Sequence, residues 1–405
     1  MKDKQAKYPQ LRFKGFTDPW EQRKLTDISE KVTEKNSDNE FSETLTNSAE
    51  YGIISQRDFF DKDISNEKNL NTYYVVRDGD FVYNPRISNF APVGPIKRNT
   101  LGRTGVMSPL YYIFRAHNVD GMYLEKYFSS TKWHRFMELN GDTGARADRF
   151  AIKDKDFVQM PISLPNLEEQ SKIARFLENV DNLIAANQRK LDLLKEQKKG
   201  YLQKMFPKNG AKVPELRFAG FADAWEQRKA AEIFKSISDK NHPELSVLSA
   251  SQKLGMIHRD DIGIDIKYDK KSIAGYKRVE PGQFVIHLRS FQGGFAYANV
   301  EGITSPAYTV LDFVDKNEND PLFWRIVLTS TDFIKHLETV TYGIRDGRSI
   351  SFADFSTLKF NVPTFEEQRT IGKFFKKIDL TITLHQRKLD LLKEQKKGFL
   401  QKMFV

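Results

Sequence analysis

The sequence predicts two similar α+β domains joined by two long helices, which pair as an antiparallel coiled coil with pseudo-two-fold symmetry. Three observations support this fold class. The chain repeats itself once over its whole length, each repeat ends in a heptad pattern of apolar residues, and short strand-like segments fill the stretch between.

The repeat is visible in two blocks of sequence. Residues 9–24 read PQLRFKGFTDPWEQRK, and residues 214–229 read PELRFAGFADAWEQRK. The thirteen letters QRKLDLLKEQKKG occur at residues 188–200 and again at residues 386–398. Because this spacing of about two hundred residues is far above that of solenoid repeats, the duplicated unit is a whole domain.

The repeated tails have the apolar spacing of a coiled coil. Eight of ten positions at alternating spacings of three and four are apolar in each tail. We therefore expect spacer helices at residues 166–206 and 364–405, and the seam from residue 173 to residue 205 is roughly 48 Å long at about 1.5 Å per residue. The seam positions are Ile173, Leu177, Val180, Ile184, Asn187, Leu191, Leu194, Lys198, Tyr201 and Met205, then Ile371, Phe375, Ile378, Ile382, His385, Leu389, Leu392, Lys396, Phe399 and Met403.

Asn187 and His385 interrupt the seam at equivalent positions near the middle of each tail. A domain separates the tails, so either orientation is open, and we favour antiparallel pairing because it relates the halves by a pseudo-two-fold axis. In that arrangement our hypothesis is that Asn187 and His385 meet and set the helix register. The alternative is that both face solvent where the helices diverge.

The diverged stretches, residues 1–165 and 207–363, predict two domains of one plan. Short segments rich in Val, Ile, Tyr and Phe alternate with Gly, Pro, Asn and Asp turns, which is typical of strands. Residues 122–140 and 321–338 have helical apolar spacing. Strands gathered around one or two helices favour an α+β domain over a doubly wound sheet.

Composition limits the class of protein. Lys and Arg total 64 against 54 Asp and Glu, a formal charge of +10 that suits a polyanion, although a merely soluble basic protein shows the same balance. The absence of cysteine excludes disulfides, thiolate nucleophiles and Cys-ligated zinc. With no signal-like N-terminus and no apolar run long enough to span a bilayer, we expect a soluble cytoplasmic protein with no membrane partner.

The order of motifs resembles the specificity subunit of type I restriction–modification systems. A WEQRK segment precedes a variable domain with a DGDFVYN or PGQFVIH strand, an LPNLEEQSKIARFL helix start follows, and the whole pattern repeats. The resemblance covers essentially the full chain. It implies that each variable domain is a target recognition domain, and that the repeated helices hold the two domains apart and dock two modification subunits.

The resemblance also assigns the chemistry to partners. Modification subunits carry S-adenosylmethionine and transfer the methyl group to adenine, while restriction subunits use ATP and Mg²⁺ for motor and nuclease activity. The chain itself is then a non-catalytic DNA-binding subunit with no cofactor. Two unlike domains on a helical spacer imply an asymmetric, bipartite DNA target, because successive major grooves on one face lie about 34 Å apart.

Base reading and phosphate contact need Arg, Lys, Asn, Gln and Ser on loops. We predict such loops at residues 84–99 and 141–149 in the first domain, and at residues 287–294 and 341–349 in the second. A single loop arginine is usually just solvated or paired with a nearby acid such as Asp148 or Asp346. The candidate DNA-binding residues are Arg86, Ser88, Asn89, Lys97, Arg98, Arg146, Arg149, Arg289, Ser290, Gln292, Arg345 and Arg348.

Catalytic and metal signatures are missing from the sequence. There is no G-x-x-x-x-G-K-[ST] loop and no H-E-x-x-H motif, and the seven histidines have no ligand spacing. Trp20 and Trp225 occupy equivalent repeat positions and are interpreted as packing anchors. Three alternatives stay open: an enzyme with its site in the diverged domains, a coiled-coil scaffold that binds only proteins, and a stand-alone DNA-binding regulator.

Overall fold

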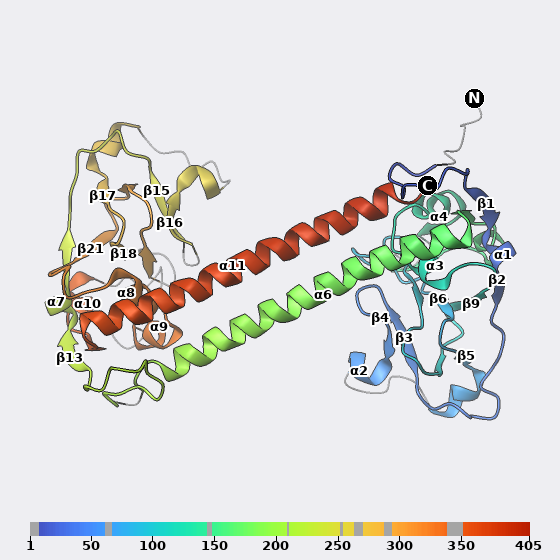
Figure 1. Ribbon diagram of the computed structural model, residues 1–405, viewed down its shortest axis with the longest axis horizontal. Coiled ribbons are helices and arrows are strands. Elements are labelled where there is room, and N and C mark those ends of the chain that lie inside the picture. The colour runs from blue at the N-terminus through green and yellow to red at the C-terminus, as the bar shows by residue number, and fades with distance from the viewer. Residues whose placement is uncertain are drawn as a thin grey trace. The chain divides into compact units, whose positions relative to one another are not determined.

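The computed structural model describes residues 8–60, 67–143, 148–208, 210–251, 254–262, 270–286, 294–337 and 351–405. The chain divides into two compact units (Figure 1). Unit 1 comprises residues 1–188 and 387–405, and unit 2 comprises residues 189–386. No helix among the described residues is long and apolar enough to cross a membrane.

Unit 1 is built on short antiparallel strands. Its elements are β1 (Glu21–Lys24), α1 (Leu25–Ile28), β2 (Ser29–Lys31), β3 (Leu45–Ser48), β4 (Gly52–Ser55), α2 (Gln56–Phe60), the 3-10 helix η1 (Glu67–Thr72), β5 (Tyr74–Val76), β6 (Phe81–Tyr83), β7 (Ile96–Arg98), β8 (Gly105–Met107), β9 (Tyr112–Ala116), α3 (Gly121–Phe128), α4 (His134–Asn140), β10 (Asp142–Thr143), β11 (Phe150–Ala151), α5 (Asp154–Phe157), β12 (Pro161–Leu164) and the start of α6 (Leu167–Lys204). The largest sheet has four strands in the order β2-β9-β6-β7, and β1-β12, β3-β4, β5-β8 and β10-β11 form pairs.

Unit 2 repeats this plan. Its elements are β13 (Glu226–Lys229), α7 (Ala230–Ile233), β14 (Phe234–Ile237), β15 (Leu248–Ser251), β16 (Gly255–His258), η2 (Arg259–Ile262), η3 (Lys270–Gly275), β17 (Lys277–Val279), β18 (Phe284–Ile286), β19 (Phe295–Tyr297), β20 (Gly302–Thr304), β21 (Thr309–Phe313), α8 (Pro321–Leu328), α9 (Thr331–Leu337), α10 (Phe352–Ser356), β22 (Lys359–Val362) and the start of α11 (Phe365–Lys402). The sheet order β14-β21-β18-β19 matches that of unit 1 strand for strand, which confirms the prediction of two similar α+β domains.

Each core includes the end of the helix that comes from the other half of the sequence. Met403 and Phe404, which follow α11, are buried in the core of unit 1 with Trp20. Met205, which follows α6, is buried in the core of unit 2 with Trp225. The Met and Phe at the end of each repeated tail therefore contribute to the hydrophobic core of a unit. Trp20 and Trp225 are buried in these cores, as the interpretation as packing anchors predicted.

The EEQ motif at each helix start fixes the neighbouring short helix. The buried amide of Gln170 accepts a hydrogen bond from the Asp120 backbone N–H at 2.9 Å and donates one to the Pro165 carbonyl at 2.7 Å. Asp120 in turn caps α3, because its carboxylate accepts from the N–H groups of Met122 and Tyr123. Gln368 and Asp320 repeat this arrangement before α8.

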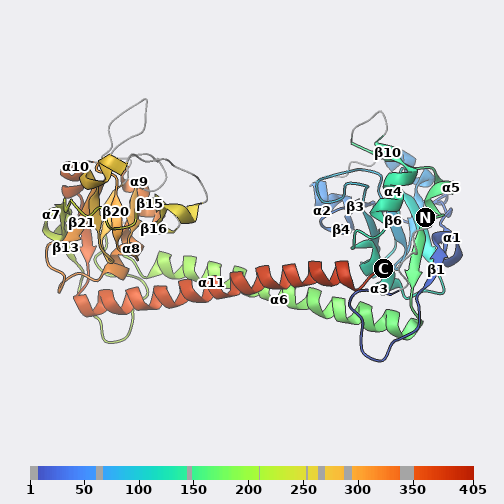
Figure 2. The same ribbon diagram turned by 90° about the horizontal axis from the view of Figure 1, so that it is seen from above.

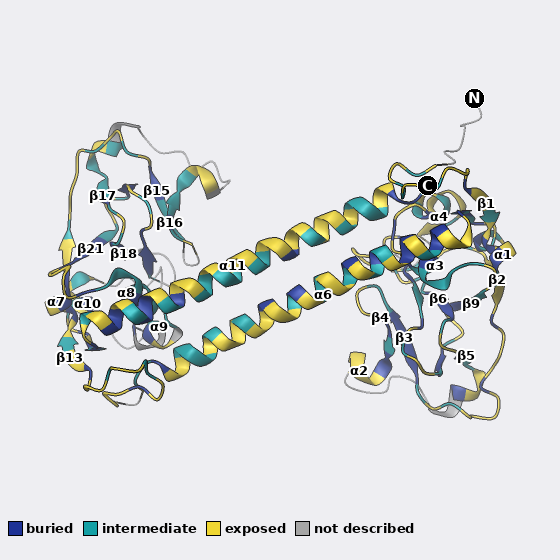
Figure 3. Ribbon diagram, in the orientation of Figure 1, coloured by how far each residue is buried: buried dark blue, intermediate teal, exposed yellow. Residues whose placement is uncertain are grey.

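The twenty predicted seam positions are buried or half-buried, and none is exposed. Along both long helices, buried and half-buried residues alternate with exposed ones (Figure 3). In unit 1 the rings of Phe176 and Phe399 meet edge to face with centroids 4.9 Å apart, and Lys396 pairs with Asp181 at 2.5 Å. From Phe176 to Asp181 the chain of α6 advances, while the contacted residue of α11 moves back from Phe399 to Lys396. The two helices therefore run antiparallel within this unit.

Unit 2 contains the same pairing. The rings of Tyr201 and Phe374 lie 5.0 Å apart, and Lys198 pairs with Asp379 at 2.6 Å. These residues are the repeat equivalents of those in unit 1. The coiled coil predicted from the heptads, and the antiparallel orientation favoured for its symmetry, are therefore confirmed at each end.

The structure describes the two polar seam residues separately. Asn187 is buried, and its amide donates to the Leu183 carbonyl one turn earlier at 2.8 Å. The Nδ1 atom of His385 is buried and has no hydrogen-bond partner among the described residues. In the register set by the Phe176–Phe399 and Asp181–Lys396 contacts of unit 1, Asn187 lies close to the level of Leu389. The direct meeting of Asn187 and His385 stays a prediction.

Candidate nucleic-acid interface

The first candidate loop, residues 84–95, joins β6 to β7 at one end of the four-stranded sheet of unit 1. The N–H of Asn84 donates to the Pro95 carbonyl at 2.9 Å and closes the base of the loop. The Asn84 side chain donates to the Asn47 carbonyl at 2.8 Å, so the loop is also tied to β3. Gly94 has a φ of +82°, and a Cβ there would lie 2.2 Å from the Asn84 carbonyl oxygen. The sequence therefore builds a loop with a fixed base.

The two predicted DNA-binding loops of unit 1 lie together. The Pro85 carbonyl accepts from the Phe150 N–H at 2.7 Å, and the Asp148 carbonyl accepts from the Ile87 N–H at 3.0 Å. The strand β10, which leads into the second loop, lies at the side of unit 1 away from α6 (Figure 2). The sequence predicted these loops separately and did not predict that they are neighbours. Backbone hydrogen bonds between them place both loops on one surface.

The described candidates on this surface carry exposed polar groups. The Arg86 side chain is 71% exposed and lies 3.9 Å from the Asp148 carboxylate, a loose ion pair of the kind that the sequence left as an alternative. Ser88 and Asn89 are exposed, and Arg149 is partly exposed. All four can donate hydrogen bonds to bases or phosphates. Their contact with DNA stays a prediction.

Lys97 and Arg98 lie in strand β7, so the prediction of a loop that runs to residue 99 is wrong at its end. The Arg98 side chain is only 22% exposed, and its Nε atom lies 3.1 Å from the Glu125 carboxylate on α3. Burial, and then the positive charge of Lys396, lower the pKa of Lys97. Because β7 pairs with β6 and packs against α3, these two side chains lie in the body of the unit rather than at the loop tip.

Six candidates fall outside the described residues. They are Arg146 in unit 1 and Arg289, Ser290, Gln292, Arg345 and Arg348 in unit 2.

Exposed aromatic residues of unit 1 were not singled out from the sequence. Phe90 is 78% exposed in the loop between Asn89 and Ala91. Tyr51, at the turn between β3 and β4, is 64% exposed, and its ring lies 6.2 Å from that of Phe59. A phenylalanine inside an Asn-, Pro- and Gly-rich loop is the sequence signal that could have found Phe90.

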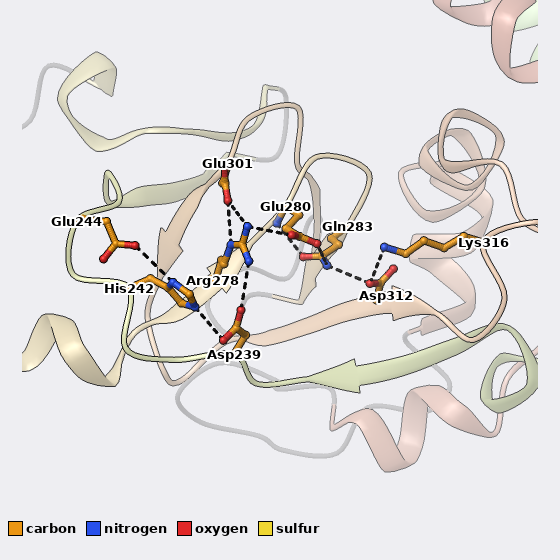
Figure 4. Close-up of polar contacts among 9 residues, drawn as sticks. All are labelled: Asp239, His242, Glu244, Arg278, Glu280, Gln283, Glu301, Asp312 and Lys316. Atoms are coloured by element: carbon orange, nitrogen blue, oxygen red, sulfur yellow. Dashed lines mark hydrogen bonds and ion pairs between the residues drawn. The ribbon is translucent and has the colours of Figure 1, made fainter.

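A group of charged residues surrounds Arg278 in unit 2 (Figure 4). Arg278 on β17 lies among three carboxylates: its Nε donates to Glu301 at 2.8 Å, and its other nitrogens lie 3.1 Å from Glu280 and 3.6 Å from Asp239. The drawn residues carry five carboxylates against Arg278 and Lys316. The carboxylates, which form what we call the acidic wall, are Asp239, Glu244, Glu280, Glu301 and Asp312.

Hydrogen bonding shifts two pKa values at the acidic wall. The Nε2 atom of His242 lies 2.9 Å from the Asp239 carboxylate. This contact raises the pKa of His242 above 6.5 and lowers the pKa of Asp239. No group of three His, Asp or Glu side chains able to hold a metal ion occurs in the described part of the chain.

Comparisons with known proteins agree with this arrangement. A family model described as the type I restriction modification DNA specificity domain matches residues 17–196 and 222–394. The type I restriction enzyme MjaVIII specificity subunit of Methanocaldococcus jannaschii is 26% identical over 317 residues, which is 73% of each chain. The MjaX specificity subunit of the same organism is 23% identical over 298 residues, which is 68% of this chain and 64% of that protein, just under two thirds.

Two solved structures share the fold. The S subunit of a type I restriction–modification system from M. genitalium has a TM-score of 0.58 at 13% identity, and the alignment covers 98% of this chain and 99% of that one. A chain from a study of complex assembly and conformational transition in a type I R-M system has a TM-score of 0.51 at 16% identity, covering 96% and 99%. With both repeats matched over most of their length, the chain belongs to the family of type I restriction–modification DNA specificity subunits.

Proposed function

We propose that this chain recognises an asymmetric, bipartite DNA target with an unread gap, each unit reading one half-site. One observation carries the proposal: the two units share their strand order, while the sequences of the segments between the strands have diverged. Two copies of one fold with different surfaces read two different short sequences.

The difference can be followed at equivalent positions of the main sheet. In unit 1 the Arg115 guanidinium donates to Asp80 at 2.8 and 3.0 Å. The matching positions in unit 2 hold Asp312 and Gln283, whose amide donates to the carboxylate at 3.1 Å. The connection between the last two strands runs over residues 84–95 in unit 1 and residues 287–294 in unit 2. The scaffold is kept while a polar pair of the main sheet and the length of the connection change, and the connection is the part that can present different groups to DNA.

We further propose that the long helices dock two copies of a modification subunit. The segments 188–200 and 386–398 are identical in sequence, and one lies largely in each unit. Leu193 and Leu391, at the same position of the two segments, are 51% and 59% exposed. Two identical helical surfaces with an exposed leucine fit two copies of one partner. The partners then carry out methyl transfer with S-adenosylmethionine and ATP-dependent restriction. This chain supplies the DNA sequence specificity.

The experiment is methylome sequencing of cells that express the chain with its modification subunit. A new, gapped, asymmetric adenine-methylation motif is expected, and it should vanish when the chain is left out. Purified chain should bind DNA with an affinity that falls steeply with salt, because phosphate contacts release counterions. DNA affinity without any motif, in the presence of an active modification subunit, would favour a stand-alone regulator. Loss of DNA affinity would favour a protein scaffold.

A further inference from the structure

Phe90 is the most exposed large hydrophobic residue among those that the structure describes, at 78%. Single exposed apolar residues are common on protein surfaces, so exposure alone indicates nothing. Phe90 differs because of where it lies: on the surface formed by the two loops of the candidate nucleic-acid interface.

The loop holds Phe90 outward by backbone contacts on both sides. The N–H of Ser88 donates to the Ala91 carbonyl at 3.1 Å, and the N–H of Ala91 donates back at 3.0 Å. Ala91 and Val93 are buried, at 6% and 1% exposed. These contacts hold the backbone on both sides of Phe90, so the exposed ring is available to a partner without rearrangement of the loop.

The neighbours of Phe90 identify the partner. Arg86, Ser88 and Asn89 carry the donors and acceptors that read base edges, and Arg86 adds positive charge. A phenyl ring can make none of these hydrogen bonds. The C5-methyl group of thymine is the apolar group that base edges present in the major groove, and phenylalanine is among the side chains that contact it.

We propose that Phe90 reads a thymine methyl group in the half-site bound by unit 1. This inference rests on the proposed function, since it names one contact by which that unit selects its sequence. The polar residues beside Phe90 then read neighbouring base edges, and the ring favours thymine over cytosine at its own position because cytosine lacks the methyl group.

The experiment uses the complex of the full chain with its modification subunit, and duplexes that carry the target found by methylome sequencing. Each thymine of the first half-site is replaced in turn by 2′-deoxyuridine, which removes only the methyl group. One replacement should weaken binding by wild type about fourfold, the effect of one buried methyl group. The same replacement should leave the affinity of the Phe90→Ala complex unchanged, and Phe90→Leu should keep part of the discrimination.

Controls separate this contact from folding and from the proposed function. The melting temperature of Phe90→Ala should match wild type because the side chain is exposed, and Leu167→Ala, which removes a 59% exposed residue at the start of α6, should keep the full deoxyuridine effect. Absence of any gapped motif with wild type would overturn the proposed function itself. A motif without a deoxyuridine effect, or an equal effect in Phe90→Ala, would overturn the role of Phe90 alone. A 2-aminopurine signal of unstacking that depends on Phe90 would also overturn it, because the ring would then be a wedge between bases.

Discussion

The Arg12 guanidinium donates two hydrogen bonds of 2.7 Å each to the Glu169 carboxylate. Arg217 and Glu367 repeat the arrangement at 2.7 and 2.6 Å in the other unit. Glu169 is fully buried, and this two-bond geometry joins the LRF segment to the EEQ helix start. Two sequence motifs that lie far apart in each repeat are thus partners in one salt bridge.

Arg12→Ala should destabilise unit 1 by about 3–5 kcal/mol, because it leaves the buried Glu169 carboxylate without its partner. The measurement is the midpoint of the unit 1 transition in urea. The matched control is Arg23→Ala, which breaks an exposed pair with Glu21 and should cost less than about 1 kcal/mol. Equal losses in the two variants would contradict the structural role of Arg12.

Lys126→Ile should destabilise the packing of α3 on α6 by about 1–3 kcal/mol. Lys126 is 4% exposed, and its Nζ atom lies 2.6 Å from Glu178 and 2.9 Å from Asp181. Its removal leaves two adjacent carboxylates, of which Asp181 alone keeps a partner in Lys396. Thermal unfolding of the variant should begin at a lower temperature than that of wild type.

Unit 2 supplies the compensating change for this variant. Counted from the capping residues Asp120 and Asp320, the counterpart of Lys126 is Ile326, and the counterpart of Glu178 on the other long helix is Lys376. The double variant Lys126→Ile with Glu178→Lys copies that solution and should recover at least half of the lost stability. If the double variant is no more stable than Lys126→Ile alone, the charge at residue 178 does not compensate for the loss of Lys126.

Gly94→Ala should lower both the stability of unit 1 and the selectivity of its half-site. The new Cβ would overlap the Asn84 carbonyl oxygen, and the positive φ adds strain of about 1 kcal/mol or more. The control is Gly102→Ala, where φ is +67° and no atom lies within 4 Å of the new Cβ among the described contacts. Methylome sequencing should show a relaxed first half-site for Gly94→Ala and an unchanged motif for Gly102→Ala.

The stability of unit 2 should fall as pH rises through the raised pKa of His242. Protonated His242 is stabilised by Asp239 in the folded state, so its pKa there exceeds the value of 6.5 expected when unfolded. The stabilisation is therefore complete below about pH 6.5 and is lost above the folded pKa. The difference in melting temperature between wild type and His242→Asn should shrink from pH 6 to pH 9. A constant difference would show that the Asp239–His242 contact does not depend on the proton.

Leu391→Asp and Leu193→Asp should each remove one modification subunit from the complex. Each substitution places a charge on one of the two identical segments and leaves the other intact, so the mass of the assembly should fall by one partner. The double variant should bind none. Native mass spectrometry measures the stoichiometry, and loss of both partners from either single variant would contradict two independent docking surfaces.

The sequence predicted the long helices and the two-domain architecture of this protein better than the contacts of the candidate DNA-binding loops. Heptads and internal repeats depend on local spacing, so α6 and α11 were predictable from positions such as Leu177 and Leu389. Their antiparallel pairing was favoured only by the symmetry of the repeat, because the heptads leave the orientation open. The end of the first loop was not, because Ile96 to Arg98 become a strand only by pairing with β6. The sequence also could not predict that the loop of Arg86 lies beside the loop of Asp148. Backbone hydrogen bonds between distant segments do not depend on side-chain identity, so neither segment carries a sequence pattern that indicates them.

The central claim is that each unit reads one half of a bipartite target. The direct test replaces residues 30–160 with the variable domain of another specificity subunit and sequences the methylome of cells that also express the modification subunit. The account predicts a motif in which one half changes while the other half and the gap length stay the same. A motif that changes in both halves, or in neither, would contradict it.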